Sequence, residues 1–149
     1  MNIDVVEIQK ILPHRFPFLL VDRVTDLKEG EFIEGFKNVT IGEHIFQGHF
    51  PNHPIYPGVM IVEGMAQVGG LLAYQSYGKE EQEDVNNKII YFMSIDKCKF
   101  RIPVTPGDRL IYKVNIIKRR GNIWVLDAKA YVDGNITCEA ELKAMVVDK

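Results

Sequence analysis

The stretch that decides the fold is GHFPNHPIYPGVMIVEGMAQVGGLLAYQS, residues 48–76. Its first half is rich in His and Pro, and its second half is almost entirely apolar with one acid, Glu63. Pro57 and Gly58 stand at the junction, where a rigid turn can lead into a helix. From Val59 onward the apolar residues form no stripe but occupy every side, which is typical of a helix enclosed by its own protein. We therefore predict a central helix that begins near Gly58.

The predicted helix carries its strongly polar side chains on one face. The members of this face follow one another at spacings of 4, 3 and 4 residues: Glu63, Gln67, Gly70 and Tyr74. Such spacings place residues on the same side of a helix. A lone carboxylate in apolar surroundings is costly, because burial of an unpaired charge is opposed by several kcal/mol. We therefore expect Glu63 to be paired, neutralised or functional, and such a group suits a general acid.

Three glycines weaken this helix: Gly64, Gly69 and Gly70. Each costs roughly 0.5–1 kcal/mol relative to Ala in a helix interior. Tertiary packing must therefore supply what helix propensity lacks, and glycines of this kind allow another group to approach closely.

Length and composition indicate one globular domain over residues 1–149, because 149 residues with 46% hydrophobic content are enough for a sizeable core. The net charge of −2 and the lack of a dense Lys or Arg run argue against a nucleic-acid binder. Cys98 and Cys138 are far apart without metal-ligand spacing, as in a protein of a reducing compartment. Residues 1–12 lack the features of a signal peptide, and the longest apolar run is too short to span a bilayer. We expect a cytoplasmic protein.

The rest of the chain predicts a short helix and several strands. Asp4 can cap a helix that Pro13 ends, with Glu7 three residues after the cap. The predicted strands are 18–27, 31–40, 88–95, 97–102, 110–116, 124–132 and 136–147. The polar segment 78–87 is predicted to be a surface connection. The later strands alternate apolar and polar residues, which favours an antiparallel sheet covering a core on one side. The fold class is therefore α+β: a long antiparallel sheet wrapped around one apolar helix.

Four histidines are candidates for chemistry: His14, His44, His49 and His53. We interpret His44 as a surface residue. His14 stands between prolines, and the sequence leaves open whether it makes a structural hydrogen bond or lies near a substrate. His49 and His53 precede the helix that carries Glu63, and a His close to a lone buried acid favours catalysis.

Metal binding and nucleophilic hydrolysis are both poorly supported. Pro51 and Pro54 prevent His49 and His53 from forming a helical pair of metal ligands, and no Cys or second acid completes a set. No Gly-x-Ser-x-Gly elbow is present. A His base and a Glu acid without nucleophile or metal suit proton transfers such as elimination, hydration or isomerisation beside a carbonyl. Free N–H groups at the helix start near Gly58 could stabilise negative charge on that carbonyl oxygen.

Three motifs in the same order carry a family resemblance: LPHRFPFLLVDRV, HFPNHPIYPGVMIVEGMAQ and IPVTPGD. They resemble the (3R)-3-hydroxyacyl-[acyl carrier protein] dehydratases of type II fatty acid synthesis, the FabZ family, and the likeness covers nearly the whole chain. The resemblance implies the hot dog fold, a long helix wrapped by an antiparallel sheet. It also implies an enzyme, a hydro-lyase, with no metal and no organic cofactor.

The resemblance assigns site residues one by one. His49 matches the catalytic His of the His-Phe-Pro-x-x-Pro motif, and Glu63 matches the catalytic acid of the central helix. In the related FabA-type dehydratase-isomerases that acid is Asp, so Glu63 favours a dehydratase with little isomerase activity. Gly58 and Val59 match the positions whose backbone holds the thioester carbonyl.

Two aromatic residues are assigned to the substrate as well. Phe50 follows the catalytic His of the motif, and Tyr91 falls where the family has an aromatic residue near the mouth of the acyl tunnel. The departures from the family pattern are mild. Ile55 and Tyr56 stand where Val-Met or similar apolar pairs are common, and Gly64 stands where Ala is usual.

The resemblance also implies partners. The first is an acyl carrier protein bearing a 3-hydroxyacyl thioester. The second is another copy of the chain, because in the family each site uses His from one subunit and Glu from the other. Such dimers usually assemble into a hexamer, as a trimer of dimers. Because carrier proteins of this pathway are acidic, we expect a basic docking patch and name three candidate residues: Lys97, Lys99 and Arg101. An ordinary solvated face of a strand would equally explain the alternation of these basic residues. Two other functions stay open, an acyl-CoA thioesterase and a non-catalytic acyl-binding module.

Overall fold

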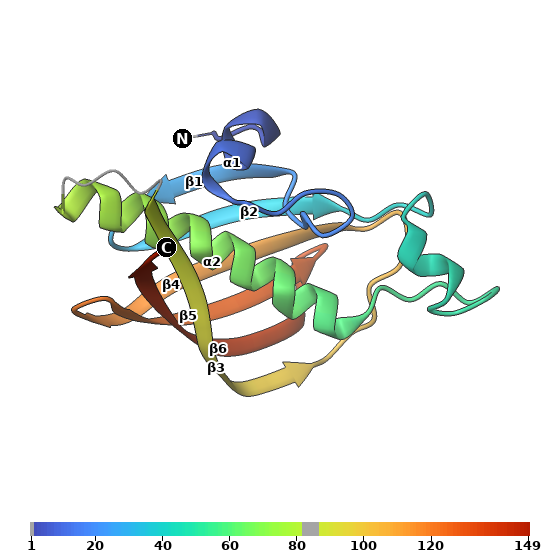
Figure 1. Ribbon diagram of the computed structural model, residues 1–149. Helices are drawn as coiled ribbons and strands as arrows, with labels where there is room; N and C mark the ends of the chain where they lie inside the picture. The colour runs from blue at the N-terminus through green and yellow to red at the C-terminus, as the bar shows by residue number, and fades with distance from the viewer. Residues whose placement is uncertain (1, 82–86) are drawn as a thin grey trace.

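The computed structural model describes residues 2–81 and 87–149, which form two α-helices, a short 3-10 helix and six strands (Figure 1). The helical elements are α1 (Val5–Ile11), η1 (His44–Gln47) and α2 (Gly58–Glu81). The strands are β1 (Arg23–Lys28), β2 (Phe32–Asn38), β3 (Lys88–Phe100), β4 (Arg109–Arg120), β5 (Ile123–Val132) and β6 (Asn135–Asp148). No helix within the described residues is long and apolar enough to cross a membrane.

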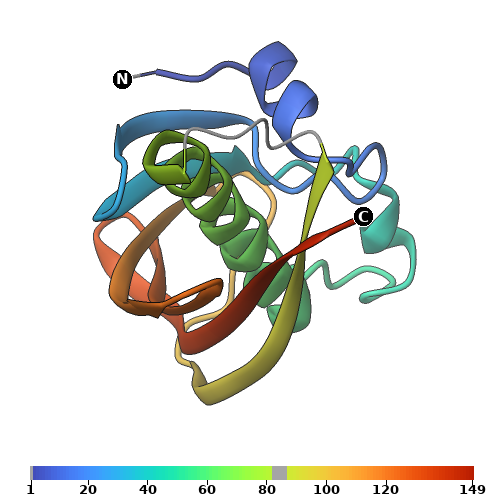
Figure 2. The ribbon, with the colours of Figure 1, turned by 60° about the vertical axis from the view of Figure 1, so that its left-hand side comes forward.

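The strands form one sheet that curls around α2. Their order is β1-β2-β4-β5-β6-β3, and every neighbouring pair is antiparallel. Figures 1 and 2 show the sheet enclosing α2 on one side, while α1 and the segment that follows it lie across the other. The predicted α+β arrangement of an antiparallel sheet around one apolar helix is therefore confirmed.

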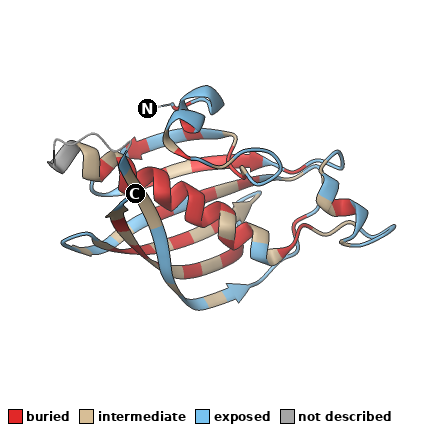
Figure 3. Cartoon of the chain, viewed as in Figure 1, coloured by how far each residue is buried: buried red, intermediate tan, exposed pale blue. Residues whose placement is uncertain are grey.

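The core lies between α2 and the concave face of the sheet, as the red segments of Figure 3 show. Most residues of α2 from Ile61 to Tyr74 are buried, as expected for a helix that is apolar on every side. The predicted alternation is also observed in the strands. The buried members include Leu110, Tyr112, Val114, Ala128, Ala130, Cys138, Ala140, Leu142 and Ala144.

The capped first helix is confirmed. Asp4 Oδ1 accepts a hydrogen bond of 3.0 Å from the Glu7 N–H, and the helix ends at Ile11, two residues before Pro13. The predicted strand that follows was wrong in its first half, because β1 begins only at Arg23. Residues 18–22 are not in a strand, and the Leu20 N–H and the Phe18 carbonyl bond to a side chain of α2, described below.

Two further boundaries differ from the prediction. The helix α2 continues to Glu81, so residues 78–81 are helical rather than part of a surface connection. The charged residues of this last turn are good helix formers, and a polar composition alone does not end a helix. Residues 82–86 of the predicted connection lie outside the described part of the chain.

The predicted strands 88–95 and 97–102 are one strand, β3, with an irregularity. Its pairing with β6 shifts between Asp96 and Lys99, and Lys97 has a positive φ of 51°. This is a β-bulge, which adds a residue to one strand and interrupts its alternation without ending its pairing.

Candidate active site

The polar residues of α2 face a cavity of about 150 Å³. Its other walls are the segment 12–14 and the first half of β3. The four residues that the sequence places on one helix face all line it: Glu63, Gln67, Gly70 and Tyr74. The predicted shared face is therefore confirmed, and it borders a cavity that β3 and residues 12–14 also line.

Within this cavity Glu63 is held from two sides. Gln67 Nε2 donates a hydrogen bond of 3.0 Å to Glu63 Oε1. His14 Nε2 lies 3.8 Å from the same oxygen, and 32% of the Glu63 side chain is exposed. Glu63 is thus a paired carboxyl at the edge of the cavity, as expected of a group too costly to bury alone. Its second oxygen, Oε2, has no hydrogen-bond partner within the described residues.

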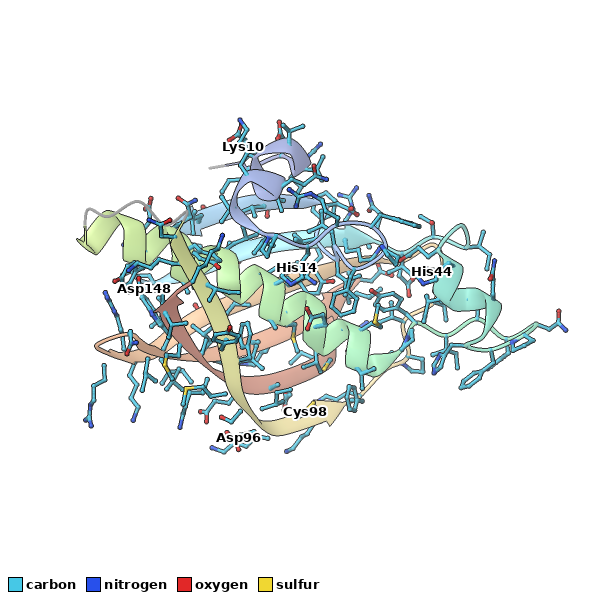
Figure 4. The ribbon with its side chains drawn as sticks, viewed as in Figure 1. Lys10, His14, His44, Asp96, Cys98 and Asp148 are labelled. Atoms are coloured by element: carbon cyan, nitrogen blue, oxygen red, sulfur yellow. The ribbon has the colours of Figure 1, made fainter. Side chains whose placement is uncertain are left out.

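His14 lies against α2 beside Glu63, whereas His44 is exposed and lies away from it on η1 (Figure 4). Burial lowers the pKa of His14 below its usual value, the charge of Glu63 opposes this, and the charge of Arg15 adds to it. His14 Nδ1 is buried without a hydrogen-bond partner in the described structure. The neutral imidazole is therefore favoured, and His14 lies beside Glu63 at the cavity.

The orientation of His49 is fixed by the loop around it. His49 Nδ1 lies 2.7 Å from the carbonyl oxygen of Ile55. A carbonyl only accepts, so the proton of the neutral ring is on Nδ1 and the lone pair is on Nε2. The ring also stacks on Phe50 with centroids 4.0 Å apart, across a cis peptide bond. Nε2 is therefore free to accept a proton.

The start of α2 borders a larger and mostly apolar cavity of about 390 Å³. The N–H groups of Gly58 and Val59 open the helix and donate to no acceptor among the residues described. Gly58 is less open than the sequence suggests, because a Cβ added there would lie 2.6 Å from the ring of Phe100. The Phe100 ring thus lies over Gly58 and lines the same cavity as Gly58 and Val59.

Comparison with known proteins identifies the family. A family model described as FabA-like domain matches residues 12–141. A relative from Campylobacter curvus, named 3-hydroxyacyl-[acyl-carrier-protein] dehydratase FabZ, is 71% identical over 99% of both chains. The chain belongs to the FabZ family. A second relative of that name, from Sulfurovum, is 68% identical over the full length of both chains.

Solved structures confirm the hot dog fold expected of a FabZ chain. The dehydratase heterocomplex ApeI:P from Xenorhabdus doucetiae superposes with a TM-score of 0.79 at 15% identity, covering 95% of this chain and 91% of that one. A hot-dog-like protein from Thermanaerovibrio acidaminovorans gives a TM-score of 0.64 at 15% identity, covering 83% and 85%. At these identities the likeness shows the fold alone.

One FabZ chain does not bring all the predicted site residues together. No hydrogen bond or ion pair among the described residues joins His49 to Glu63, and His49 is absent from the lining of the Glu63 cavity. Gly58 and Val59 line the other cavity. Within the described part of the chain, His49, Glu63 and the amides of Gly58 and Val59 therefore lie in three separate places.

The predicted aromatic residues lie at the surface. The side chain of Phe50 is 47% exposed and that of Tyr91 is 59% exposed. The neighbours of Tyr91 on β3, Ile90 and Phe92, line the Glu63 cavity instead. Within one chain, Phe92 and Tyr74 are therefore the aromatic walls of that cavity.

The predicted basic patch is not a continuous strand face. Lys97 lies in the bulge of β3, and Arg101 follows the end of the strand. Arg101 also forms an ion pair of 2.8 Å with Glu139, which lies opposite Lys99. The hydrogen bond and charge of Arg101, with the charges of Lys99 and Lys129, hold the pKa of Glu139 below its usual value. Part of the positive charge of the patch is therefore offset by a carboxylate at the same place.

Tyr56, a departure from the family pattern, is part of the core. Its side chain is buried and packs on Phe46 with ring centroids 6.1 Å apart. Its hydroxyl has no hydrogen-bond partner in the described structure, and burial raises the pKa of this phenol. Among the residues described, no three His, Cys, Asp or Glu side chains are grouped so as to hold a metal ion.

Sequence reasoning missed the full role of Gln67 and Phe100. The spacing of four residues between Glu63 and Gln67 was visible, but the backbone partners of Gln67 are 47 and 49 residues away in sequence. Nothing in the sequence brings Phe100 to Gly58, because that contact depends on how far β3 curls around the helix.

Proposed function

We propose that this FabZ chain dehydrates (3R)-3-hydroxyacyl-[acyl carrier protein] to the trans-2-enoyl thioester in type II fatty acid synthesis, with His49 as base and Glu63 as acid. The observation that carries the mechanism is the hydrogen bond from His49 Nδ1 to the Ile55 carbonyl. It holds the ring in the tautomer whose Nε2 can accept a proton.

The reaction is a β-elimination. The C2–H bond breaks and its proton passes to His49 Nε2, while the electron pair forms the C2=C3 double bond. The C3–O bond breaks, and the hydroxyl leaves as water with a proton from Glu63, directly or through a water molecule. Return of a proton from His49 to Glu63 through solvent restores both groups. General acid and base catalysis of this kind contributes about 10²–10⁴-fold to a rate.

The thioester carbonyl is placed at the amides of Gly58 and Val59. Negative charge develops on this oxygen as the C2 proton is removed, and two N–H groups at a helix N-terminus stabilise it. Both amides lack an acceptor within the described residues, so this interaction displaces no existing bond. Phe50 and Tyr91, which are exposed in one chain, are assigned to the walls and the mouth of the acyl path.

The complete site requires two subunits of the single 1–149 domain. His49 of one chain serves Glu63 of its partner, because one chain leaves these residues in separate places. Strand β3 lies at the edge of the sheet and exposes apolar side chains there, including Tyr91, Met93 and Ile95 (Figure 3). An edge of this kind suits association with a second copy. Three such dimers form the hexamer, in the cytoplasm where its carrier-linked substrate is made.

The test uses purified protein and crotonoyl thioester, with the enoyl absorbance as readout. Hydration lowers the absorbance with the wild-type chain, and the variants Glu63→Ala and His49→Ala lower the rate at least about 10²-fold while remaining folded. Turnover close to wild type in either variant would remove that residue from the mechanism. Release of free thiol, rather than loss of the enoyl group, would replace the dehydratase with a thioesterase.

A further inference from the structure

Gln67 occupies a central position between Glu63 and the segment that covers it. Its side chain is 2% exposed and makes three hydrogen bonds. Oε1 accepts from the Leu20 N–H at 2.8 Å, and Nε2 donates to the Phe18 carbonyl at 2.7 Å. The third bond runs from Nε2 to Glu63 Oε1 at 3.0 Å.

The two backbone bonds determine which way the amide points. The Leu20 N–H needs an acceptor and the Phe18 carbonyl needs a donor, so the amide oxygen must face Leu20 and the nitrogen must face Phe18. The nitrogen has two hydrogens, and the second is directed at Glu63. Gln67 can therefore act on Glu63 as a donor only.

The segment that fixes Gln67 is itself held rigidly. The buried hydroxyl of Tyr112 donates a hydrogen bond of 2.9 Å to the carbonyl of Leu20. Leu20 is therefore bonded through its N–H to α2 and through its carbonyl to β4. A buried polar network of this kind, with each of these members satisfied, holds side chains in one arrangement.

A donor at one oxygen of a carboxyl decides where its proton lies. In a protonated carboxyl the carbonyl oxygen accepts and the hydroxyl oxygen donates. Glu63 Oε1 already accepts from Gln67, so it takes the part of the carbonyl oxygen. His14 Nε2 stands on the side of this same Oε1, at 3.8 Å. The acidic proton therefore belongs on Oε2, the oxygen that has no partner in the described structure.

We propose that Gln67 is a positioning residue for the reaction: it holds Glu63 so that Oε1 is the carbonyl oxygen and Oε2 presents its proton to the departing C3 hydroxyl. This inference rests on the proposed function, since it gives a role only to a Glu63 that acts as acid. Gln67 does not touch the substrate and acts through Glu63.

The test is a double-mutant cycle with Gln67→Leu, Glu63→Gln and the double variant, each measured for kcat and KM under steady-state conditions with substrate in excess. The matched control is Ser76→Ala. Ser76 is buried on the same helix, and its Oγ accepts a hydrogen bond of 2.7 Å from the Gly30 N–H, so the control also removes a bond between α2 and distant backbone. Gln67→Glu is a second variant that keeps an acceptor for the Leu20 N–H and removes the amide donor.

With Glu63 present, Gln67→Leu and Gln67→Glu lower kcat about 10–100-fold with KM within about 3-fold, and Ser76→Ala leaves both near wild type. In the Glu63→Gln background, Gln67→Leu changes kcat by less than about 3-fold, because the group it positions is already gone. An equal loss of kcat with and without Glu63 would mean that Gln67 only supports the cavity, and would overturn the inference. An unchanged kcat in both Gln67 variants would overturn it as well. Wild-type turnover by Glu63→Gln alone would instead overturn the proposed function.

Discussion

The hydroxyl of Tyr112 lies where a methyl group on Gly64 would have to be. A Cβ added at Gly64 would collide with the Tyr112 oxygen and lie 2.6 Å from its Cζ. Because Gly64 has no side chain, the hydroxyl passes over the helix and reaches the carbonyl of Leu20. The residue that weakens α2 as a helix thus permits a buried hydrogen bond that anchors residues 18–20, to which Gln67 is bonded.

Replacement of Gly64 by Ala is predicted to destabilise the protein. The substitution gains up to about 1 kcal/mol in helix propensity. Overpacking against Tyr112 costs about 1–3 kcal/mol, because the ring is fully buried and cannot move aside freely. We expect a net loss of up to about 2 kcal/mol in the free energy of unfolding, measured by urea denaturation.

Gly70→Ala is the matched control on the same helix. Its added Cβ would meet Leu12 Cδ2 at 3.7 Å and Ile90 Cδ1 at 3.9 Å, which are ordinary contact distances. We expect this variant to be as stable as the wild type or more so. Equal stability changes in the two variants would show that the Tyr112 contact does not limit position 64.

The stability of the fold is predicted to depend on His14 at mildly acidic pH. Burial keeps the pKa of His14 in the folded chain below the usual 6.5 of the unfolded chain. As the pH falls below about 6.5, the unfolded chain therefore binds the proton before the folded chain does, and stability is lost. We expect the unfolding free energy of the wild type, relative to that of His14→Gln, to decrease between pH 7.5 and pH 5.5.

His44→Gln is the comparison for this measurement, because His44 is exposed and distant from Glu63. His44→Gln should still lose unfolding free energy between pH 7.5 and pH 5.5, because His14 is still present. A constant difference between the wild type and His14→Gln over the whole pH range would contradict the folded-state environment assigned to His14.

Replacing the cations of the basic patch and replacing the neighbouring Glu139 are predicted to change KM for carrier-linked substrate in opposite directions. Lys99 and Arg101 lie beside Glu139, whose carboxylate offsets their charge. If an acidic carrier protein docks there, replacing both cations by Ala raises KM for carrier-linked substrate about 2–5-fold, and Glu139→Gln lowers it. Added salt should reduce both effects.

The control for docking is a small crotonoyl thioester without a carrier protein. Its KM should be the same in the wild type and in both patch variants. Changes of similar size with the small substrate would assign Lys99, Arg101 and Glu139 to the cavity that Arg101 helps to line, rather than to a docking surface.

The sequence predicted the centre of the fold better than its edges. The apolar residues on every side of the helix at 59–74 indicate a helix that is buried all round. The alternation of apolar and polar residues in β4, β5 and β6 indicates a sheet with one buried face. The bulge at Lys97 and the helical last turn of α2 were missed. The bulge depends on how β3 pairs with β6, and the last turn of α2 depends on helix propensity within a polar run. Hydrophobic periodicity indicates neither feature.

The candidate site shows the same limit at the level of single residues. The helical spacing placed Glu63 and Gln67 together, and the structure agrees. The contacts of Gln67 with residues 18–20 and of His14 with Glu63 join segments about 50 residues apart, and one sequence contains no information on that pairing. His49 and Glu63 share no hydrogen bond, ion pair or cavity among the described residues, so one chain does not test their predicted pairing.

The most direct test of the account is complementation between two inactive variants, His49→Ala and Glu63→Ala. If each site takes His49 from one subunit and Glu63 from the other, a mixed dimer has one site with both residues intact. Random reassembly of an equimolar mixture makes half of the dimers mixed, so about a quarter of the wild-type rate should return. The double variant mixed with itself is the control and stays inactive. A mixture that remains as inactive as its two components would contradict the shared site, and with it the central claim.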